Sequence, residues 1–310
     1  MVQSAMARER LFALRETIAR LENRKVPSLE AENLGQDNGA EKPCPVLPFG
    51  IAPLDAALQG GLPLSGLMEV RAQETRDAGT AMGFALALTI LVQDNRDGER
   101  QDAISPVLWI GQGMAAPEAG LPYGRGLQAY GLDPRVFVFS TPRSLEDALW
   151  IAEAALSVPA FAAVILEVRG NPAHFGLGES RRLHLRALSR SIPLFVLRQA
   201  GEEEASSALL RFLVRPAPSA HRFLPSGKAL SGSIGNPVFH VTIEKSRHPS
   251  PAEFSLEWSS DGHRFTPVGF DAAQPSDRQP AHPRPHLPAS AGRQGDATEM
   301  GRLLAFQRAS

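Results

Sequence analysis

One stretch of the sequence, residues 67–88, has the frame of a phosphate-binding loop but lacks its lysine. The pattern predicts a strand, a turn and then an apolar helix. A working loop reads G-x-x-x-x-G-K-[ST], because its glycines let backbone N–H groups close around phosphate and its lysine reaches the outer phosphates. Two alignments fit the turn to this motif, with Ala78 or Thr80 at the lysine position, and the first also sets the carboxylate of Asp77 against the phosphate. The degenerate loop consists of Ala72, Asp77, Ala78, Gly79 and Thr80.

The rest of the sequence must supply the sheet that positions this loop. Continuous apolar segments alternate with helical patterns, which is the signature of a parallel sheet covered on both faces. Farther on, period-two alternation around His248–Pro251 predicts an antiparallel hairpin, and Gly60-Gly61 ends a short helix over 54–58. The expected strands are 67–71, 107–110, 135–139, 163–168 and 193–197, the longer helices 80–93, 123–130, 144–157 and 181–190, and the hairpin strands 239–244 and 253–258.

Composition argues against several classes of protein. The chain has 310 residues, enough for one sizeable core with residues left for tails. With 32 basic and 33 acidic residues, its net charge near zero argues against a protein that coats a polyanion. The single cysteine, Cys44, allows neither a disulfide framework nor a cysteine-based zinc site. Because the sequence has neither a membrane-length apolar run nor a signal-peptide pattern, we expect a soluble cytoplasmic protein.

The segments outside the expected core, 46–270, differ from it in composition. Residues 1–25 carry a leucine-rich stripe that predicts an amphipathic helix, which either packs on the domain or docks a partner. Residues 26–45 are expected to form a polar linker, and residues 271–297 a proline-rich, disordered tether. The last segment, 298–310, either folds back on its own domain or acts as a docking peptide. Its apolar anchors are Leu303, Leu304 and Phe306.

Several features, in their order along the chain, resemble the core of the RecA family of recombinases. Gly50–Asp55 with Gly60-Gly61 looks like that family's lead-in to the phosphate loop, and Gly126–Pro134 with the strand after it also fits. Gln199, at the end of the last expected parallel strand, matches the family's nucleotide-sensing glutamine. The resemblance implies a RecA-like, doubly wound, mostly parallel α/β sheet.

More specifically, four segments resemble the ImuA family, the RecA-like proteins of bacterial mutagenesis cassettes. This resemblance covers roughly residues 5–260 and the end of the chain, and it implies a role in SOS-induced translesion DNA synthesis. Its implied partners are an ImuB-like, catalytically inactive relative of Y-family polymerases and an error-prone C-family DNA polymerase, with RecA as a further candidate. The four segments are the N-terminal Arg-Leu helix, Arg181–Leu185, Leu209–Ser219 and Arg302–Phe306.

Two positions that serve catalysis in the RecA family argue further against ATP hydrolysis. Glu167 matches the strand-end acidic residue that holds Mg²⁺ through water. Without the lysine, however, the favoured interpretation of Glu167 is a solvated or ion-paired carboxylate. The strand over 107–110 lacks the water-orienting carboxylate, because Gly111–Met114 follows it and Glu118 lies past a proline. We therefore expect no enzyme activity, no cofactor and no metal site, while weak nucleotide binding at a backbone nest in the loop stays open.

Direct DNA binding is expected to be weak at most. The short loop over residues 199–207 carries Glu202-Glu203-Glu204, and three carboxylates oppose a phosphate backbone. The helix before it carries arginines on one face, with Arg198 beyond. They suit a solvated face or an acidic partner better than nucleic acid, because no aromatic residues alternate with them. The arginines of this patch are Arg181, Arg182, Arg186 and Arg190.

Hypotheses from different functional classes follow from these features. The first is a non-catalytic interaction protein that bridges components of a lesion-bypass polymerase assembly. The second is a divergent RecA-like, DNA-dependent ATPase or nucleotide switch. A SulA-like cell-division inhibitor with a related fold is the third. An ATP-turnover assay with single-stranded DNA separates the first from the second.

Overall fold

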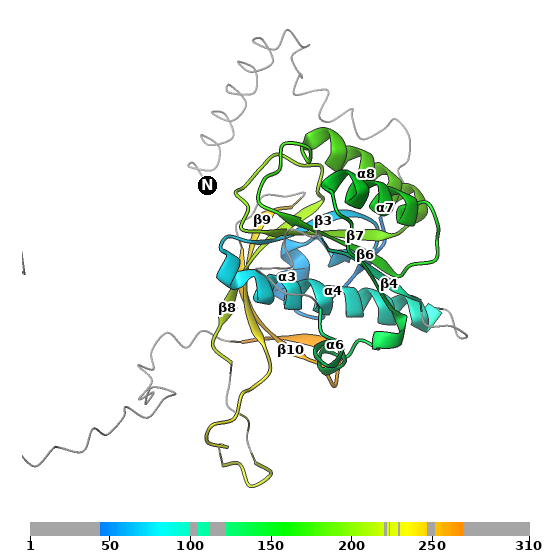
Figure 1. Cartoon of the computed structure of the whole chain (residues 1–310). Helices are drawn as coiled ribbons and strands as arrows, with labels where there is room; N and C mark the ends of the chain where they lie inside the picture. The colour runs from blue at the N-terminus through cyan, green and yellow to red at the C-terminus, as the bar shows by residue number, and fades with distance from the viewer. Residues whose placement is uncertain are drawn as a thin grey trace, which may run out of the picture.

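The computed structural model describes residues 44–99, 105–111, 122–219, 222, 224–228, 230–246 and 252–268. The described part is a mixed α/β fold with a mostly parallel central sheet and antiparallel strands on its C-terminal side (Figure 1). The expected N-terminal helix, most of the linker, the tether and the docking peptide with its anchors lie outside these residues.

The central sheet has the strand order β11-β10-β9-β8-β3-β7-β6-β4-β5 in the described part of the chain. The strands from β8 to β5 in this order are parallel neighbours, and β9, β10 and β11 continue the sheet in antiparallel fashion. β3, which leads into the degenerate loop, lies inside the sheet between β7 and β8, so it is buried along its whole length. The bounds are β3 Gly66–Ala72, β4 Val107–Ile110, β5 Phe137–Ser140, β6 Ala163–Arg169, β7 Pro193–Gln199, β8 Leu210–Ala217, β9 Val238–Lys245, β10 Glu253–Ser259 and β11 Arg264–Pro267.

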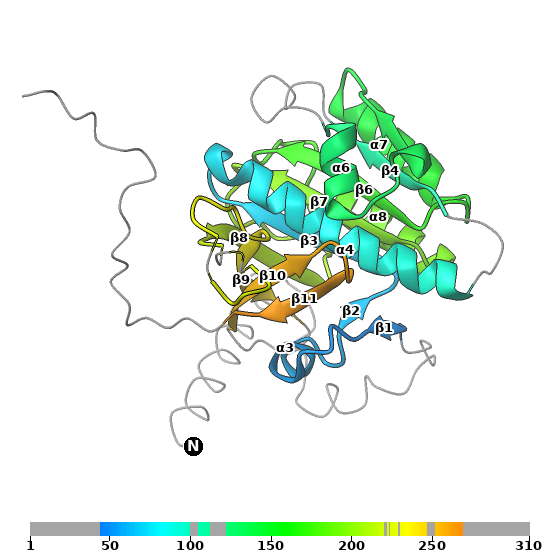
Figure 2. The ribbon, with the colours of Figure 1, turned by 90° about the horizontal axis from the view of Figure 1, so that it is seen from below.

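Helices cover both faces of the parallel part of the sheet. α4 (Ala78–Glu99) runs across one face with α6 (Gly124–Tyr130) beside it, and α7 (Leu145–Leu156) and α8 (Leu177–Arg190) pack side by side on the other face (Figures 1 and 2). This double cover explains why β4 and the first four or five residues of β6 and β7 are continuous apolar segments rather than alternating ones. The remaining elements are α3 Ala52–Ala57, the short strands β1 Val46–Leu47 and β2 Leu62–Pro63, and 3₁₀ turns at Thr75–Asp77 and Pro134–Val136.

An aromatic cluster joins α4 to the antiparallel strands. The ring of Phe84 on α4 lies 5.6 Å from Phe212, 5.5 Å from Phe239 and 5.5 Å from Phe265, measured between ring centroids. These residues come from β8, β9 and β11, and each ring is buried. Aromatic side chains bury large areas, so this cluster fixes the start of α4, and with it the degenerate loop, against the C-terminal strands.

The predicted alternation of strands and helices is confirmed, with differences at the ends of elements. Ser144 caps α7 as expected, because its Oγ accepts the N–H of Asp147 at 3.1 Å. α8 begins at Leu177, four residues earlier than the predicted helix. Two strands of the central sheet escaped prediction, as did the short strands β1 and β2. β8 has charged residues and a proline among its apolar positions, and β11 is only four residues long.

Candidate functional site

The degenerate loop has the predicted strand–turn–helix form but not the backbone of an αR–αL anion nest. β3 ends at the buried Ala72, a 3₁₀ turn follows at Thr75–Asp77, and α4 begins at Ala78. One type of anion nest is formed by successive residues in right- and left-handed conformations. Between residues 72 and 80, all of which the structure describes, no residue has a positive φ, so this type of nest is absent from the stretch. The N–H groups of the 3₁₀ turn and of the first turn of α4 are the backbone groups that could meet an anion here.

The polar groups around the loop are engaged with one another. The carboxylate of Glu74 pairs with Arg76, with 2.9 Å between Oε2 and Nε. Arg215, at the end of β8, donates from Nη2 to Gln73 Oε1 at 3.2 Å. Asp77 is buried. Neither arginine projects from the position of the missing lysine.

Glu167 lies near the carboxyl end of β6, which β7 separates from β3, the strand that leads into the loop. Its side chain is only 3% exposed, and Trp109 Nε1 on β4 donates to Glu167 Oε2 at 3.2 Å. Gln199, at the end of β7, donates from Nε2 to the other carboxylate oxygen. Burial raises the pKa of the Glu167 carboxyl, and the hydrogen bond from Trp109 offsets part of that rise.

The interpretation of Glu167 as a solvated or ion-paired carboxylate is therefore wrong. Both carboxylate oxygens accept hydrogen bonds from neutral donors inside the sheet, and the described residues supply no cation to this group. Gln199, the expected nucleotide sensor, serves as one of these donors. Three adjacent strands, β4, β6 and β7, are thus cross-linked by a polar cluster of Trp109, Glu167 and Gln199.

The position after β4 is closely packed against this polar cluster. A Cβ atom on Gly111 would stand 3.0 Å from the ring of Phe139 and 3.3 Å from Glu167 Oε2. A larger side chain at this position would have to displace one of these groups. The other residues considered for orienting water, Gly113 and Glu118, lie outside the described residues.

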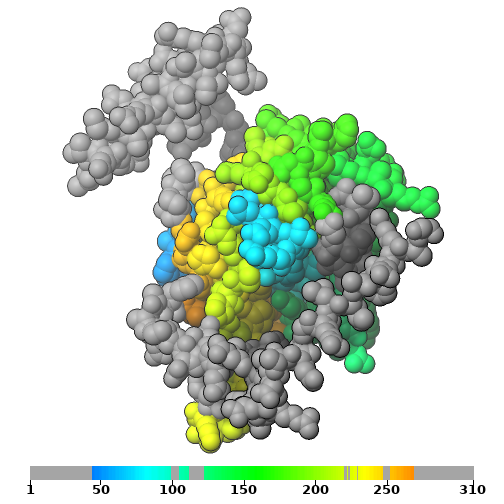
Figure 3. All heavy atoms as spheres, turned by 60° about the vertical axis from the view of Figure 1, so that its left-hand side comes forward, coloured from blue at the N-terminus to red at the C-terminus, as the bar shows by residue number. Residues whose placement is uncertain are grey.

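A shallow cavity of about 400 Å³ opens beside the start of α4. Gly79 and Thr80 line one side of it, and Pro216 and Phe239 from β8 and β9 line another. Figure 3 shows the blue-to-cyan start of α4 at the molecular surface next to the yellow-green residues of this region. Among the described lining residues there is no lysine or arginine, so a phosphate group in this cavity would meet no cationic side chain.

The arginine patch of α8 is exposed, as predicted, but part of its charge is neutralised. Arg182 and Arg186 both pair with Glu153 of α7, the second at 3.3 Å between Nη2 and Oε2. Arg186 also donates to Ser157 Oγ at 3.2 Å. Arg181 and Arg190 are exposed on the same helix. Two of the arginines at this four-residue spacing, Arg182 and Arg186, therefore link α8 to α7 through ion pairs with Glu153.

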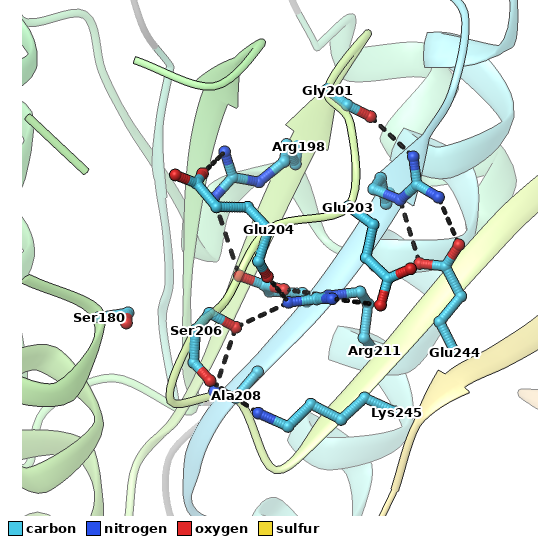
Figure 4. A network of polar contacts seen from close by, with 12 residues as sticks. Ser180, Arg198, Gly201, Glu203, Glu204, Ser206, Ala208, Arg211, Glu244 and Lys245 are labelled. Atoms are coloured by element: carbon cyan, nitrogen blue, oxygen red, sulfur yellow. Dashed lines mark hydrogen bonds and ion pairs between the residues drawn. The ribbon is translucent and has the colours of Figure 1, made fainter. Parts of the chain in front are cut away.

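Arg198, expected to extend this patch, belongs instead to a buried charge cluster on the sheet (Figure 4). Glu69 of β3, 2% exposed, pairs with Arg211 of β8 and lies 3.8 Å from Arg198 Nη2 of β7. Arg71 of β3 pairs with Glu244 of β9. The sequence already held a sign of this cluster, because Glu69 and Arg71 are two residues apart and side chains at that spacing point to the same side of a strand.

The acidic loop after β7, whose carboxylates were expected to oppose a phosphate backbone, is part of this charge cluster. Glu203 Oε1 lies 3.3 Å from Arg211 Nη1, and Glu204 Oε2 lies 3.4 Å from Arg198 Nη1. Glu202 contacts the chain through its backbone, which exchanges hydrogen bonds with the Asn171 side chain at 2.7 and 3.1 Å. Two of the three carboxylates thus balance buried cations.

Comparison with known proteins adds no identification: no protein-family model and no curated protein matches this chain. Within the described residues, no helix combines the length and apolar character needed to cross a membrane. The same residues contain no cluster of histidine, cysteine and carboxylate side chains that could hold a metal ion.

Proposed function

We propose that this chain is a non-catalytic, RecA-like accessory protein, similar to the ImuA family, that acts in SOS-induced translesion DNA synthesis. In this role it bridges an ImuB-like inactive polymerase relative and an error-prone C-family polymerase in the cytoplasm. The observation that carries the proposal is the loss of catalytic groups at the positions where the RecA family has them. The strand, turn and helix of a phosphate loop are present between β3 and α4, but the lysine is missing and the Glu167 carboxylate is hydrogen-bonded inside the sheet.

Phosphoryl transfer depends on positioning and on neutralising the charge that develops in the transition state. Here the lysine position holds Ala78 or Thr80, and the loop has no αL residue to form a nest. Glu167, the candidate Mg²⁺-linked carboxylate, is sealed by Trp109 and Gln199. A nucleotide would have to break this polar cluster before Glu167 could face a metal ion.

The architecture is compatible with the RecA-like part of the proposal. A mostly parallel sheet with helices on both faces and an antiparallel extension on the C-terminal side is the arrangement that the resemblance implies. Such a scaffold offers helix faces and strand ends for partners without requiring chemistry at the loop. Because one fold can carry many functions, the state of the catalytic positions supports the proposal more strongly than the architecture does.

Partner binding tests the bridging role through the C-terminal segment. Leu303, Leu304 and Phe306 are proposed to anchor the ImuB-like subunit, and burying three such side chains would contribute roughly 4–8 kcal/mol before ordering costs. Deleting residues 298–310 should abolish co-purification of that subunit and leave the thermal midpoint of the isolated protein unchanged. A matched control, Arg302→Ala with Gln307→Ala, should retain the subunit. A midpoint lowered by several degrees with the subunit still bound would show that the segment belongs to the fold.

A further inference from the structure

The segment Gly201–Ser207, here called the acidic strap, crosses the sheet without forming a helix or strand. Its backbone is fastened by cationic side chains that rise from the strands below (Figure 4). Gly201 O accepts from Arg71 Nη1 at 2.7 Å, Ser206 O accepts from Lys245 Nζ at 2.7 Å, and Glu204 O accepts from Arg211 Nη2. The strap therefore depends on side-chain anchors, among them three charged ones, rather than on sheet pairing.

Of the strap's two ion-paired carboxylates, that of Glu203 is held more loosely. The separations of Glu203 and Glu204 from Arg211 and Arg198, 3.3 and 3.4 Å, exceed the roughly 2.7–2.9 Å of strong charge-assisted hydrogen bonds, although Glu204 Oε2 also accepts from Asn171 Nδ2 at 3.0 Å. The side chain of Glu203 is 65% exposed and that of Glu204 is 36% exposed, whereas the two arginines beneath them are almost fully buried. Ions in solution can reach these pairs from outside, so other anions can compete for the arginines.

Charge balance shows what the strap covers. Beneath it, the cations Arg71, Arg198, Arg211 and Lys245 face two carboxylates among the described residues, those of Glu69 and Glu244, which leaves an excess of two positive charges. Glu203 and Glu204 cancel that excess. Burial lowers the pKa of Lys245, and the nearby charge of Arg211 lowers it further.

The strap also begins at a strained residue. Ala200, the residue between β7 and the strap, has a φ of 50°, a left-handed conformation that is unusual for a residue with a side chain. A Cβ atom on the next residue, Gly201, would stand 2.6 Å from Arg198 Cδ. The backbone at Ala200 is strained, and Gly201 lies close to the buried Arg198. Displacing the strap would relieve this strain, so the strap would hinge at these two residues.

We propose that the acidic strap covers a latent site for a phosphate-bearing oligoanion, and that Glu203 and Glu204 occupy the positions its phosphate groups would take. Arginine suits this exchange because its planar guanidinium binds carboxylate and phosphate with the same two-pronged geometry. The ligand is either the backbone of single-stranded nucleic acid or a free polyphosphate. In the closed state the strap competes internally, so the protein binds such anions weakly. The proposal is independent of the bridging role.

Matched variants within the strap test this site. Tripolyphosphate binding is measured by calorimetry and binding of a fluorescein-labelled dT12 by anisotropy, both at low salt, for the wild type, Glu203→Gln and Glu202→Gln. The two variants lose the same charge from adjacent positions, but only Glu203 pairs with a buried arginine. We expect Glu203→Gln to bind at least one probe about tenfold more tightly, the scale of one charged hydrogen bond, and Glu202→Gln to match the wild type.

The two probes identify the source of the phosphate groups. Tighter binding of dT12 alone assigns the site to a nucleic-acid backbone, and tighter binding of tripolyphosphate alone assigns it to free polyphosphate. Adding Lys245→Gln to the Glu203→Gln variant should reverse the gain, and bound probe should speed amide hydrogen exchange across residues 201–208. An equal gain in Glu202→Gln, a gain that survives Lys245→Gln, or no gain for either probe would overturn the proposal.

Discussion

Replacing Glu69 by glutamine removes one charge from the centre of the buried cluster without changing the shape of the side chain. Glu69 Oε1 lies 3.8 Å from Arg198 Nη2, and at an effective dielectric constant of about 20 this pair alone attracts by about 4 kcal/mol. Arg211 lies closer still to the other oxygen. Because the variant leaves buried cations without their counter-charge, we expect Glu69→Gln to lower the free energy of unfolding by about 3–5 kcal/mol.

Urea unfolding followed by tryptophan fluorescence measures this loss. The matched control is Glu74→Gln, which breaks the exposed pair with Arg76 and should cost less than about 1 kcal/mol. Raising the salt concentration should diminish the small effect of the control but not the large effect of Glu69→Gln, because buried pairs are screened weakly. Equal, small losses in the two variants would mean that the cluster is hydrated, and the reasoning from burial would fail.

Three further predictions concern the loop, the polar cluster and the arginine patch. Burial raises the folded-state pKa of Glu167, so its carboxyl stabilises the fold below the unfolded-state pKa of about 4.5 and loses that contribution as pH rises through the folded value. The stability of Glu167→Gln relative to wild type should therefore increase from pH 4 to pH 8 in urea titrations, and a pH-independent difference would contradict the assigned shift. Gly79→Ala, in the open first turn of α4, should raise stability by up to about 1 kcal/mol in the same assay, whereas Gly61→Ala, with φ +135° and a Cβ 2.1 Å from Leu47 O, should cost more than about 2 kcal/mol. Binding of single-stranded DNA to the wild type should be weak, with a slope of about −2 to −3 in log K against log salt, and a steep slope would show contacts beyond the α8 arginines.

The sequence pattern was sufficient for features set by neighbouring residues. Continuous apolar segments predicted β4, β6 and β7, and the serine–aspartate spacing predicted the start of α7, because burial period and capping are local properties. The turn before α4 was also predicted, and the absence of its lysine is visible in the sequence itself. Each of these inferences needed fewer than about twenty consecutive residues.

The environment of the candidate site could not be read in this way, because it depends on contacts between distant residues. Arg71 and its partner Glu244 are separated by 173 residues, and Trp109 and Glu167 by 58. Glu167 looked like an exposed strand-end carboxylate until the strand order placed Gln199 beside it. β8 was missed for a related reason: Arg211 interrupts its apolar pattern, yet Glu69 on the neighbouring strand allows that arginine to be buried.

ATP turnover by the purified protein, with and without single-stranded DNA, tests the central claim most directly. The loop without its lysine and the sealed carboxylate of Glu167 predict phosphate release at the background rate under both conditions. The double change Asp77→Gly with Ala78→Lys should leave hydrolysis absent even if it improves nucleotide binding, because the sequence supplies no carboxylate directly after Ile110 to orient the attacking water. Turnover above background in the wild type that disappears in Glu167→Ala would contradict the account.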